Sequence, residues 1–223
     1  MVSTESPHGP VLPPRFFFGV SLAAVGFFAL WTWVVRPWAP PPSFDMSWAE
    51  IWRDWSETHA AFSGVMVYLT DIGGVAAMAL LTVMAVIWQS AVHNRTLVVA
   101  WIAVMIGCVI LNSGTKHIFD RARPGELLRA PVVHERNPSY PSGHSMGSTI
   151  GYGMLAYSLL LAERRRGARA LILLLCATIV LGVGLSRIYL RAHWLSDVVA
   201  GWTVGLAWLF FCLGWLERWM RTP

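Results

Sequence analysis

The chain carries little charge. Asp, Glu, Lys and Arg make up 13% of its 223 residues, whereas soluble domains usually contain about 25%. So few charged side chains do not cover a water-exposed surface, which excludes an ordinary cytosolic enzyme, a disordered chain and a coiled coil. Hydrophobic residues are abundant instead, at 56% of the total, and they cluster in long runs. This pattern is typical of a protein that crosses the membrane several times.

Cysteine and lysine are also scarce. The three cysteines, Cys108, Cys176 and Cys212, lie within hydrophobic runs, so we interpret them as packed thiols and not as a disulfide framework or a zinc site. Lys116 is the only lysine. The formal net charge of +5 would suit a nucleic-acid partner, but arginines on cytoplasmic loops explain it more simply. We therefore expect the bilayer, and no nucleic acid, as a partner.

Six hydrophobic runs predict the spans of an all-α membrane protein. They lie at about 16–35, 72–88, 97–112, 145–162, 170–185 and 198–216. A helix of about 16 residues is only about 24 Å long, shorter than the roughly 30 Å of the hydrocarbon core. We therefore expect the shorter helices to continue into more polar neighbouring residues. Residues 1–223 should form one domain with six transmembrane helices.

The segments around the first two runs need separate interpretation. The run at 16–35 is longer than the about 7–15 apolar residues of a signal peptide, and no small-x-small cleavage site follows it, which favours a retained span. Residues 47–58 place four hydrophobic side chains at helical spacing, which predicts an amphipathic helix: Trp48, Ile51, Trp52 and Trp55. This helix either lies in the membrane interface or packs on the bundle. Residues 60–70 predict another short helix, which dips into the membrane and ends before Gly73 and Gly74.

Basic residues indicate the orientation once the candidate anion-binding residues are set aside. With both termini on one side, the two sides carry similar numbers of basic residues. When Lys116, Arg123 and Arg187 are left out of the count, the side of the termini has more basic residues than the other side. The same side also holds the cluster Arg164–Arg166 in a short loop. We therefore expect cytoplasmic termini and place the loop 113–144 outside.

Three polar segments lie at the ends of spans assigned to the outer side. They are residues 116–124, residues 141–144 and residues 186–197. An up-and-down bundle puts the outer ends of its third to sixth spans next to one another. We therefore expect the three segments to meet in one pocket.

This pocket would hold an anion. Lys116, Arg123 and Arg187 would supply three positive charges, the arginines as paired donors to phosphate oxygens and the lysine as a point charge. Ser142 and Gly143 open the fourth span, and backbone N–H groups at a helix start bind anions, with glycine allowing close approach. Together these residues predict a receptor for a phosphoryl group near the membrane surface.

Two histidines would supply the chemistry. His193 and Asp197 lie four residues apart, so Asp197 can accept the Nδ1–H of His193 and leave Nε2 as a nucleophile or base. His144, beside the anion-binding turn, can protonate a leaving oxygen. This set matches phosphoryl transfer through a phosphohistidine. Asp120 and Asp197 are the only acids in the three segments, too few for the usual magnesium site, so we expect no metal and no other cofactor.

Each of these features alone has a plainer explanation. A single Lys or Arg at a span end usually reaches to the interface, and Pro-Ser-Gly-His alone is an ordinary helix-start turn. Their combination at neighbouring outer ends, in a chain so poor in charge, favours a catalytic site. A transporter or channel with a basic vestibule would explain the cations but not the His–Asp pair. It would also be expected to carry charges at mid-span, where none of the six runs has one.

The three segments resemble the signature of the type-2 phosphatidic acid phosphatase superfamily. That signature reads Lys-x6-Arg-Pro, then Pro-Ser-Gly-His, then Ser-Arg-x5-His-x3-Asp, and the sequence matches it at 116–124, 141–144 and 186–197. The resemblance is strong over about 97–216 and extends to the first two spans only through their number. It implies a bundle of six membrane helices with the site at the outer surface.

The resemblance also implies a role for each motif residue. His193 would be the nucleophile, Asp197 its orienting partner and His144 the general acid. The remaining motif residues would hold the phosphoryl oxygens: Lys116, Arg123, Arg187, Ser142 and Gly143. Separately from the resemblance, the position of residues 134–137 in the loop before the second motif segment suggests a contact with the leaving lipid.

The resemblance leaves the substrate open. It implies a metal-independent phosphatase of a lipid phosphate or diphosphate in a bacterial inner membrane, and it favours undecaprenyl diphosphate or phosphatidylglycerophosphate. A lipid phosphotransferase and a lipid A phosphatase with the same site are the alternatives. Soluble vanadate-dependent haloperoxidases share the pocket motif, but six hydrophobic runs argue against that branch.

Overall fold

The computed structural model describes residues 12–128 and 137–221, and within them all regular secondary structure is helical. This agrees with the all-α expectation. The elements follow one another as α1 (Pro14–Val35), α2 (Ser43–Thr58), α3 (Ala60–Ile72), α4 (Val75–Ala91), α5 (Arg95–Ile118), α6 (Pro124–Leu127), α7 (Gly143–Ala162), α8 (Arg166–Tyr189) and α9 (Leu195–Met220).

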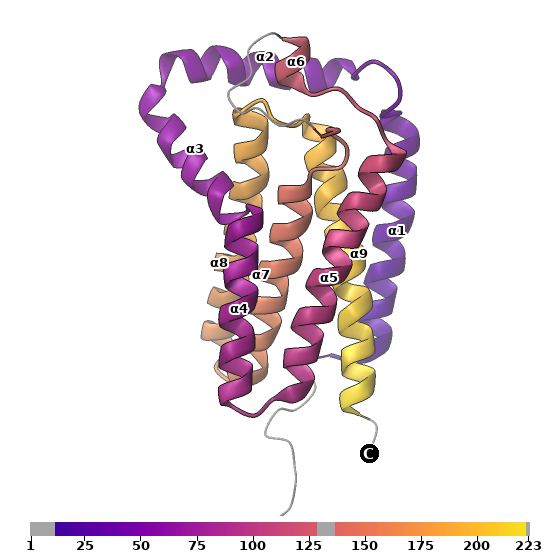
Figure 1. Cartoon of the computed structure of the whole chain (residues 1–223), viewed down its shortest axis with the longest axis vertical. Helices are drawn as coiled ribbons and strands as arrows, with labels where there is room; N and C mark the ends of the chain where they lie inside the picture. The colour runs from indigo at the N-terminus through magenta and orange to yellow at the C-terminus, as the bar shows by residue number, and fades with distance from the viewer. Residues whose placement is uncertain (1–11, 129–136, 222–223) are drawn as a thin grey trace, which may run out of the picture.

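The long helices form a bundle, and α2 lies across one end of it (Figure 1). From the far end of α2, α3 slopes back to the bundle and meets α4 there (Figure 1). The two helices are bent by 50° relative to each other, and the break contains Gly73 and Gly74. The glycine pair therefore ends α3 as expected, and the helix of the second hydrophobic run begins only at Val75.

Several helices continue beyond their hydrophobic runs, as the bilayer thickness requires. α5 extends from the run at 97–112 to Ile118, and α8 extends from the run at 170–185 to Tyr189. α9 begins at Leu195, before its run at 198–216. The motif residues on these helices consequently occupy their first or last turns.

Length and composition support fewer spans than the six expected. Among the described residues, α1, α5, α8 and α9 are long and apolar enough to cross a membrane, and the bent pair of α3 and α4 would make a fifth span. α7 is not in this set, because many of its 20 residues are glycine, serine, threonine or tyrosine. Most of these residues are buried, against α4, α5, α8 and α9. A helix enclosed by other helices needs small residues for close packing more than it needs an apolar surface.

Glycines on α9 bring it close to the start of α7. A Cβ atom at Gly201 would lie 2.5 Å from the carbonyl oxygen of Ser142 and 3.0 Å from the Cβ of Ser145. At Gly205, one turn further along, it would lie 2.8 Å from the Cβ of Thr149. Only glycine permits this approach of the two backbones.

The described ends of the chain lie together at the end of the bundle opposite α2. Arg221 donates a hydrogen bond of 2.8 Å to the carbonyl oxygen of Leu12, and Figure 1 shows the last turns of α9 at that end. The hydrophobic core lies between the two ends, where Trp101 is fully buried and donates to Ser158 Oγ at 3.1 Å.

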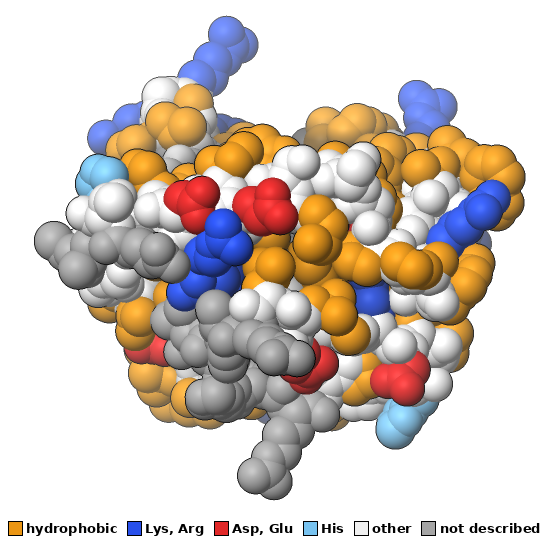
Figure 2. Space-filling model, turned by 90° about the horizontal axis from the view of Figure 1, so that it is seen from above, with side chains coloured by type: hydrophobic (Ala, Val, Ile, Leu, Met, Phe, Trp, Pro, Cys, Tyr) orange, Lys and Arg blue, Asp and Glu red, His pale blue; other side chains and the backbone are white. Residues whose placement is uncertain are grey.

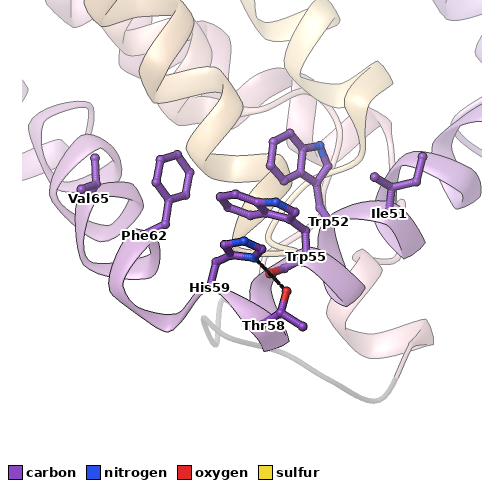
Figure 3. A pocket seen from close by; sticks show the side chains of 7 residues that line it. All are labelled: Ile51, Trp52, Trp55, Thr58, His59, Phe62 and Val65. Carbon is purple, nitrogen blue, oxygen red and sulfur yellow. Dashed lines mark hydrogen bonds between the residues drawn. The ribbon is translucent and has the colours of Figure 1, made fainter.

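The apolar face expected for residues 47–58 is divided between two environments. Trp48 and Ile51 are exposed, whereas Trp52 and Trp55 pack edge-on against Tyr189, at ring-centroid distances of 5.8 and 5.9 Å. α2 thus both packs on the bundle and presents apolar side chains outward. Where α2 meets α3, an aromatic cavity of about 990 Å³ opens (Figure 3), lined by Ile51, Trp52, Trp55, Thr58, His59, Phe62 and Val65.

Candidate active site

The three motif segments meet at the end of the bundle that α2 crosses, as the up-and-down arrangement predicts. Backbone hydrogen bonds hold them together: the N–H of Gly125, which directly follows the first segment, donates to the carbonyl oxygen of Arg191 at 3.1 Å, and Ser142 N donates to that of Asp197 at 3.0 Å. The indole of Trp194 donates to the carbonyl oxygen of Ala122 at 2.9 Å. Seen from this end, hydrophobic and charged side chains share the surface (Figure 2), and the central motif residues lie beneath it.

His193 is buried, with 1% of its side chain exposed, and both ring nitrogens face polar groups. Nε2 lies 3.2 Å from Nη1 of Arg123. Nδ1 lies 3.3 Å from Ser139 Oγ and 3.6 Å from Asp197 Oδ2. Because a guanidinium has only donors, Nε2 must be the acceptor, which assigns the ring proton to Nδ1.

The carboxylate of Asp197 is completely buried and accepts hydrogen bonds at both oxygens. Oδ1 accepts from Arg121 Nη1 at 2.5 Å. Oδ2 accepts from Ser139 Oγ at 2.5 Å and from the backbone N–H of Trp194 at 2.9 Å. The 3.6 Å to His193 is longer than an ordinary hydrogen bond, and the Ser139 hydroxyl contacts both groups.

Two expected cations converge on one oxygen atom. The Oδ1 atom of Asn137 accepts from Lys116 Nζ at 2.9 Å and from Arg123 Nη2 at 2.5 Å. Arg123 also donates to the carbonyl oxygens of Asn137, at 2.9 Å, and Ala192, at 2.6 Å. The guanidinium is thereby fixed in one orientation, with Nη1 toward His193 and Nη2 toward Lys116.

The third expected cation, Arg187, is buried in the last turn of α8 and donates to Thr70 Oγ1 of α3 at 2.6 Å. Its carbonyl oxygen accepts from the backbone N–H groups of Ala192, at 3.0 Å, and His193, at 3.2 Å. The chain therefore folds back on the end of α8, which brings His193 to the site. Arg191 within this turn has a φ of 56°, an uncommon conformation for a residue other than glycine.

The Pro-Ser-Gly-His turn opens α7 as predicted. Ser142 is the N-cap residue, and its hydroxyl accepts from Ser145 N at 3.4 Å. Gly143 lies so close to α5 that a Cβ there would meet Asn112 Oδ1 at 2.7 Å. His144 follows on the first turn of α7, and a Cβ at Gly74 would lie 3.6 Å from its Nε2.

A cavity of about 560 Å³ reaches this site from between α4, α5 and α7. One end is polar and is lined by Lys116, Asn137, Gly143, His144 and His193. The remainder is lined mainly by apolar side chains, among them Met78, Val83, Ile102, Met105, Ile106 and Val109. A molecule with a charged end and a hydrocarbon end fits such a cavity.

Sequence reasoning missed several residues of this site. Arg121 lies within the first motif segment, where the sequence indicates no role for it, yet it is buried and forms ion pairs with two carboxylates. Asp45 lies far away in the sequence on α2, and its side chain is completely buried beside Arg121. Ser139 lies just before the Pro-Ser-Gly-His turn, and this proximity to a motif was its only available signal. Asn137 was expected to contact the leaving lipid, and its role as an acceptor for Lys116 and Arg123 was not foreseen.

Asp45 belongs to the same polar cluster. It accepts from Arg121 Nη2 at 2.8 Å, from Ser196 N at 2.9 Å and from Ser196 Oγ at 2.5 Å. Burial raises the pKa of the Asp45 carboxyl above its usual value, while the Ser196 hydrogen bonds and the Arg121 charge act to lower it.

In the described ranges 12–128 and 137–221, no three His, Cys, Asp or Glu side chains come close enough together to hold a metal ion. The carboxylates of Asp45 and Asp197 are bridged by Arg121. Residues 134–136, expected to contact the leaving lipid, lie outside the described residues.

Comparison with known proteins identifies the family. The model of the PAP2 superfamily matches residues 97–221, more than half of the chain. The chain belongs to the PAP2 superfamily. The match covers all three motif segments, 116–124, 141–144 and 186–197.

Relatives of this PAP2 chain include named phosphatases. Phosphatidylglycerophosphatase B of Bacillus subtilis (strain 168) is 34% identical over 114 residues, which cover 49% of this chain and 53% of the relative. The chain thus spans about half the length of that relative. Undecaprenyl-diphosphatase of Sulfolobus acidocaldarius is 28% identical over 155 residues, covering 68% of this chain and 69% of the relative.

A solved structure shares the fold. The crystal structure of a transmembrane PAP2 type phosphatidylglycerolphosphate phosphatase from Bacillus subtilis matches with a TM-score of 0.72 at 22% identity. The match covers 91% of this chain and 98% of that one. The helical arrangement is therefore common to both proteins.

Proposed function

We propose that this chain is a membrane lipid phosphatase that works through a phosphohistidine on His193, without a metal ion. The observation that carries the proposal is the convergence of Lys116 and Arg123 on one acceptor atom, Asn137 Oδ1, beside the Nε2 atom of His193. A phosphoryl oxygen at the position of that acceptor would be held by both cations.

In the first step, the lone pair of His193 Nε2 attacks phosphorus and the bond from phosphorus to the lipid oxygen breaks. His144 donates a proton to the departing oxygen, which leaves as an alcohol or, from a diphosphate, as a lipid monophosphate. In the second step, a water molecule gives a proton to His144 and attacks phosphorus. The N–P bond breaks, which releases inorganic phosphate and restores His193.

The fixed charges stabilise both transition states. Lys116, Arg123 and Arg187 are anchored before the substrate binds, so little reorganisation is needed when negative charge develops on the phosphoryl oxygens. The backbone N–H groups at the start of α7, from Gly143 onward, add donors with the helix dipole behind them. Arg123 and Arg187 are buried and Lys116 is half-buried, so these cations would act in a medium of low dielectric constant, where their effect is larger than in water.

The cavity between α4, α5 and α7 supports a lipid as the substrate. Its polar end holds the phosphate site and its apolar walls suit an acyl or prenyl chain. Phosphatidylglycerophosphate and undecaprenyl diphosphate are the favoured substrates, in agreement with the names of two relatives. A lipid A phosphatase and a lipid phosphotransferase remain the alternative assignments.

We place the protein in a bacterial inner membrane with six spans, counting α7 and the bent pair of α3 and α4 as one span each. The chain ends and the Arg164–Arg166 cluster would face the cytoplasm, because basic residues are retained there. The site, at the opposite end of the bundle, would then open at the outer face, with α2 in the interface.

Phosphate release should be measured with purified wild-type protein and His193→Ala on phosphatidylglycerophosphate, undecaprenyl diphosphate, phosphatidic acid and lipid A, with a chelator present. We expect the wild type to be active and His193→Ala to be inactive. The control is His93→Asn, because His93 is exposed at the α4–α5 turn and Asn accepts its positive φ of 58°.

Each part of the proposal can fail separately. Undiminished turnover by His193→Ala would exclude the nucleophile, and loss of wild-type activity with the chelator would exclude the metal-free mechanism. A ³²P-labelled donor should label the wild-type protein transiently and not His193→Ala. Label that ends in a second lipid instead of inorganic phosphate would assign a phosphotransferase.

A further inference from the structure

Arg121 connects two buried carboxylates that come from different helices. Its Nη1 atom lies 2.5 Å from Asp197 Oδ1 on α9, and its Nη2 atom lies 2.8 Å from Asp45 Oδ2 on α2. The exposed fraction of the Arg121 side chain is 3%, and that of both carboxylates is 0%. One guanidinium thus joins Asp197, the proposed orienting partner of His193, to a helix that carries none of the three motifs.

The connection is reinforced at the start of α9. Asp45 accepts from both the backbone N–H and the hydroxyl of Ser196, the residue before Asp197, and Arg121 Nη1 donates to the same hydroxyl at 2.7 Å. The guanidinium also lies 5.8 Å from the ring of Trp194 and 6.0 Å from that of Tyr140. These contacts leave the Arg121 side chain a single orientation.

We propose that Arg121 and Asp45 are positioning residues for phosphoryl transfer: Arg121 fixes the carboxylate of Asp197 against His193, and Asp45 fixes Arg121. The inference rests on the proposed function of His193. Without Arg121, the Oδ1 atom of Asp197 loses its charged donor and the carboxylate can turn away from Nδ1 of His193. Without the charge of Asp45, Arg121 keeps Asp197 but loses its second anchor.

Arg121 and Asp45 carry opposite charges, so removing each charge should change the protonation of the His193 imidazole in opposite directions. His193 faces Arg123 at Nε2 and Asp197 at Nδ1, and shares its cavity with Lys116 and His144. Removing the positive charge of Arg121 favours a protonated imidazole, which is inactive as a nucleophile. Removing the negative charge of Asp45 has the opposite effect.

The test compares Arg121→Gln, Arg121→Lys and Asp45→Asn with wild type, using the lipid that gives the highest turnover in the substrate panel. For Arg121→Gln we expect kcat to fall about 10- to 100-fold, the effect of losing one charge-assisted hydrogen bond, with KM changed less than about threefold. The acidic limb of the kcat/KM profile should move to higher pH in Arg121→Gln and to lower pH in Asp45→Asn. Arg121→Lys keeps the positive charge, so the acidic limb should stay at the wild-type pH. Its kcat should be lower than that of the wild type, because one ammonium group cannot bridge both carboxylates as the two nitrogens of a guanidinium group do.

The matched controls lie on α2. Asp54→Asn makes the same change as Asp45→Asn on an exposed side chain, and Arg53→Gln removes a half-buried arginine. Both should keep the wild-type kcat and pH profile. Folding is judged by size-exclusion chromatography in detergent. If Arg121→Gln does not fold, the positioning role is tested by the shift of the acidic limb in Asp45→Asn and by the reduced kcat of Arg121→Lys.

Wild-type kcat and a superimposable pH profile in the Arg121 and Asp45 variants would overturn the inference. The inference would also be overturned if the activity of each variant fell only in proportion to its folded fraction, with no shift in the acidic limb of the kcat/KM profile. A purely structural ion pair would behave in this way. His193→Ala, measured in parallel, distinguishes a failure of the proposed function from a failure of the positioning role. If His193→Ala keeps its turnover, the proposed function is wrong. If His193→Ala is inactive while the Arg121 and Asp45 variants behave as wild type, only the positioning role is wrong.

Discussion

Replacing Gly201 by alanine should slow phosphoryl transfer while leaving the protein folded. Gly201 lies on the first turns of α9, four residues after Asp197, and faces the turn that opens α7. The new methyl group would lie 2.5 Å from the carbonyl oxygen of Ser142, where ordinary contacts begin at 3.4 Å. A carbonyl group of the backbone cannot rotate away as the end of a side chain can. The start of α9 must therefore move from α7 by most of an ångström.

The size of the effect follows from the position of this contact. Ser142 belongs to the proposed phosphate-binding turn, and α9 carries Asp197 beside His193, so the shift would separate the phosphate site from the nucleophile. A misplacement of about 1 Å costs on the order of 100-fold in rate. Overpacking of this kind destabilises by about 1–3 kcal/mol, which alanine offsets in part by its better helix propensity of about 1 kcal/mol.

Steady-state phosphate release and thermal unfolding in detergent would measure both effects. The control is Gly26→Ala on α1, where no atom lies within 4 Å of the added Cβ. This variant should keep its kcat and unfold at the same or a slightly higher temperature. A Gly201→Ala protein with the kcat and melting temperature of the wild type would refute the argument that close α7–α9 packing sets the geometry of the site.

Two further variants test other contacts. Asn137→Ala removes the oxygen that accepts hydrogen bonds from both Lys116 and Arg123. The inhibition constant of inorganic phosphate should fall severalfold, because the phosphate no longer competes with that oxygen for the two cations. A higher inhibition constant would show that Asn137 instead holds the cations in place. Tyr140→Phe should lose about 1 kcal/mol of stability with the hydrogen bond to Thr32. Burial raises the pKa of Tyr140 to about 12, so the folded wild type holds the phenol proton more tightly than the unfolded chain does. The melting temperatures of wild type and Tyr140→Phe should therefore differ by a constant amount below about pH 9. Above about pH 10 the difference should shrink, because the unfolded wild type begins to lose the phenol proton and the wild type loses stability. A difference that varies between pH 6 and 8 would contradict this assignment.

The sequence was a good guide to the helices, because hydrophobic runs and helix-start residues are local signals. It placed α5, α8 and α9 and predicted that they extend into polar residues at their ends. The number of six spans stays a prediction, because α7 carries the small and polar residues of a helix enclosed by others and is not among the helices that are apolar enough to span a membrane by composition. Hydropathy describes contact with lipid, and α7 makes its contacts with protein.

The same division holds at the site. The motif spacing alone indicated that His193, Asp197 and Arg123 would meet, because each lies at a helix end on the same side of an up-and-down bundle. It did not indicate Arg121 as a partner of Asp197 or Asp45 as a partner of Arg121. Each of these pairs is separated by 76 residues, and no periodicity relates them.

What the sequence determined by itself is therefore the helical membrane fold and the set of reactive groups, since both follow from residue type and local spacing. Tertiary structure decided which groups hold the others in place. Asp45 reaches Ser196 and Arg121 only because α2 crosses the end of the bundle (Figure 1), and Ser139 reaches Asp197 and His193 only because the loop before α7 folds over α9. Buried polar groups require partners, but which partners they find depends on how the helices pack.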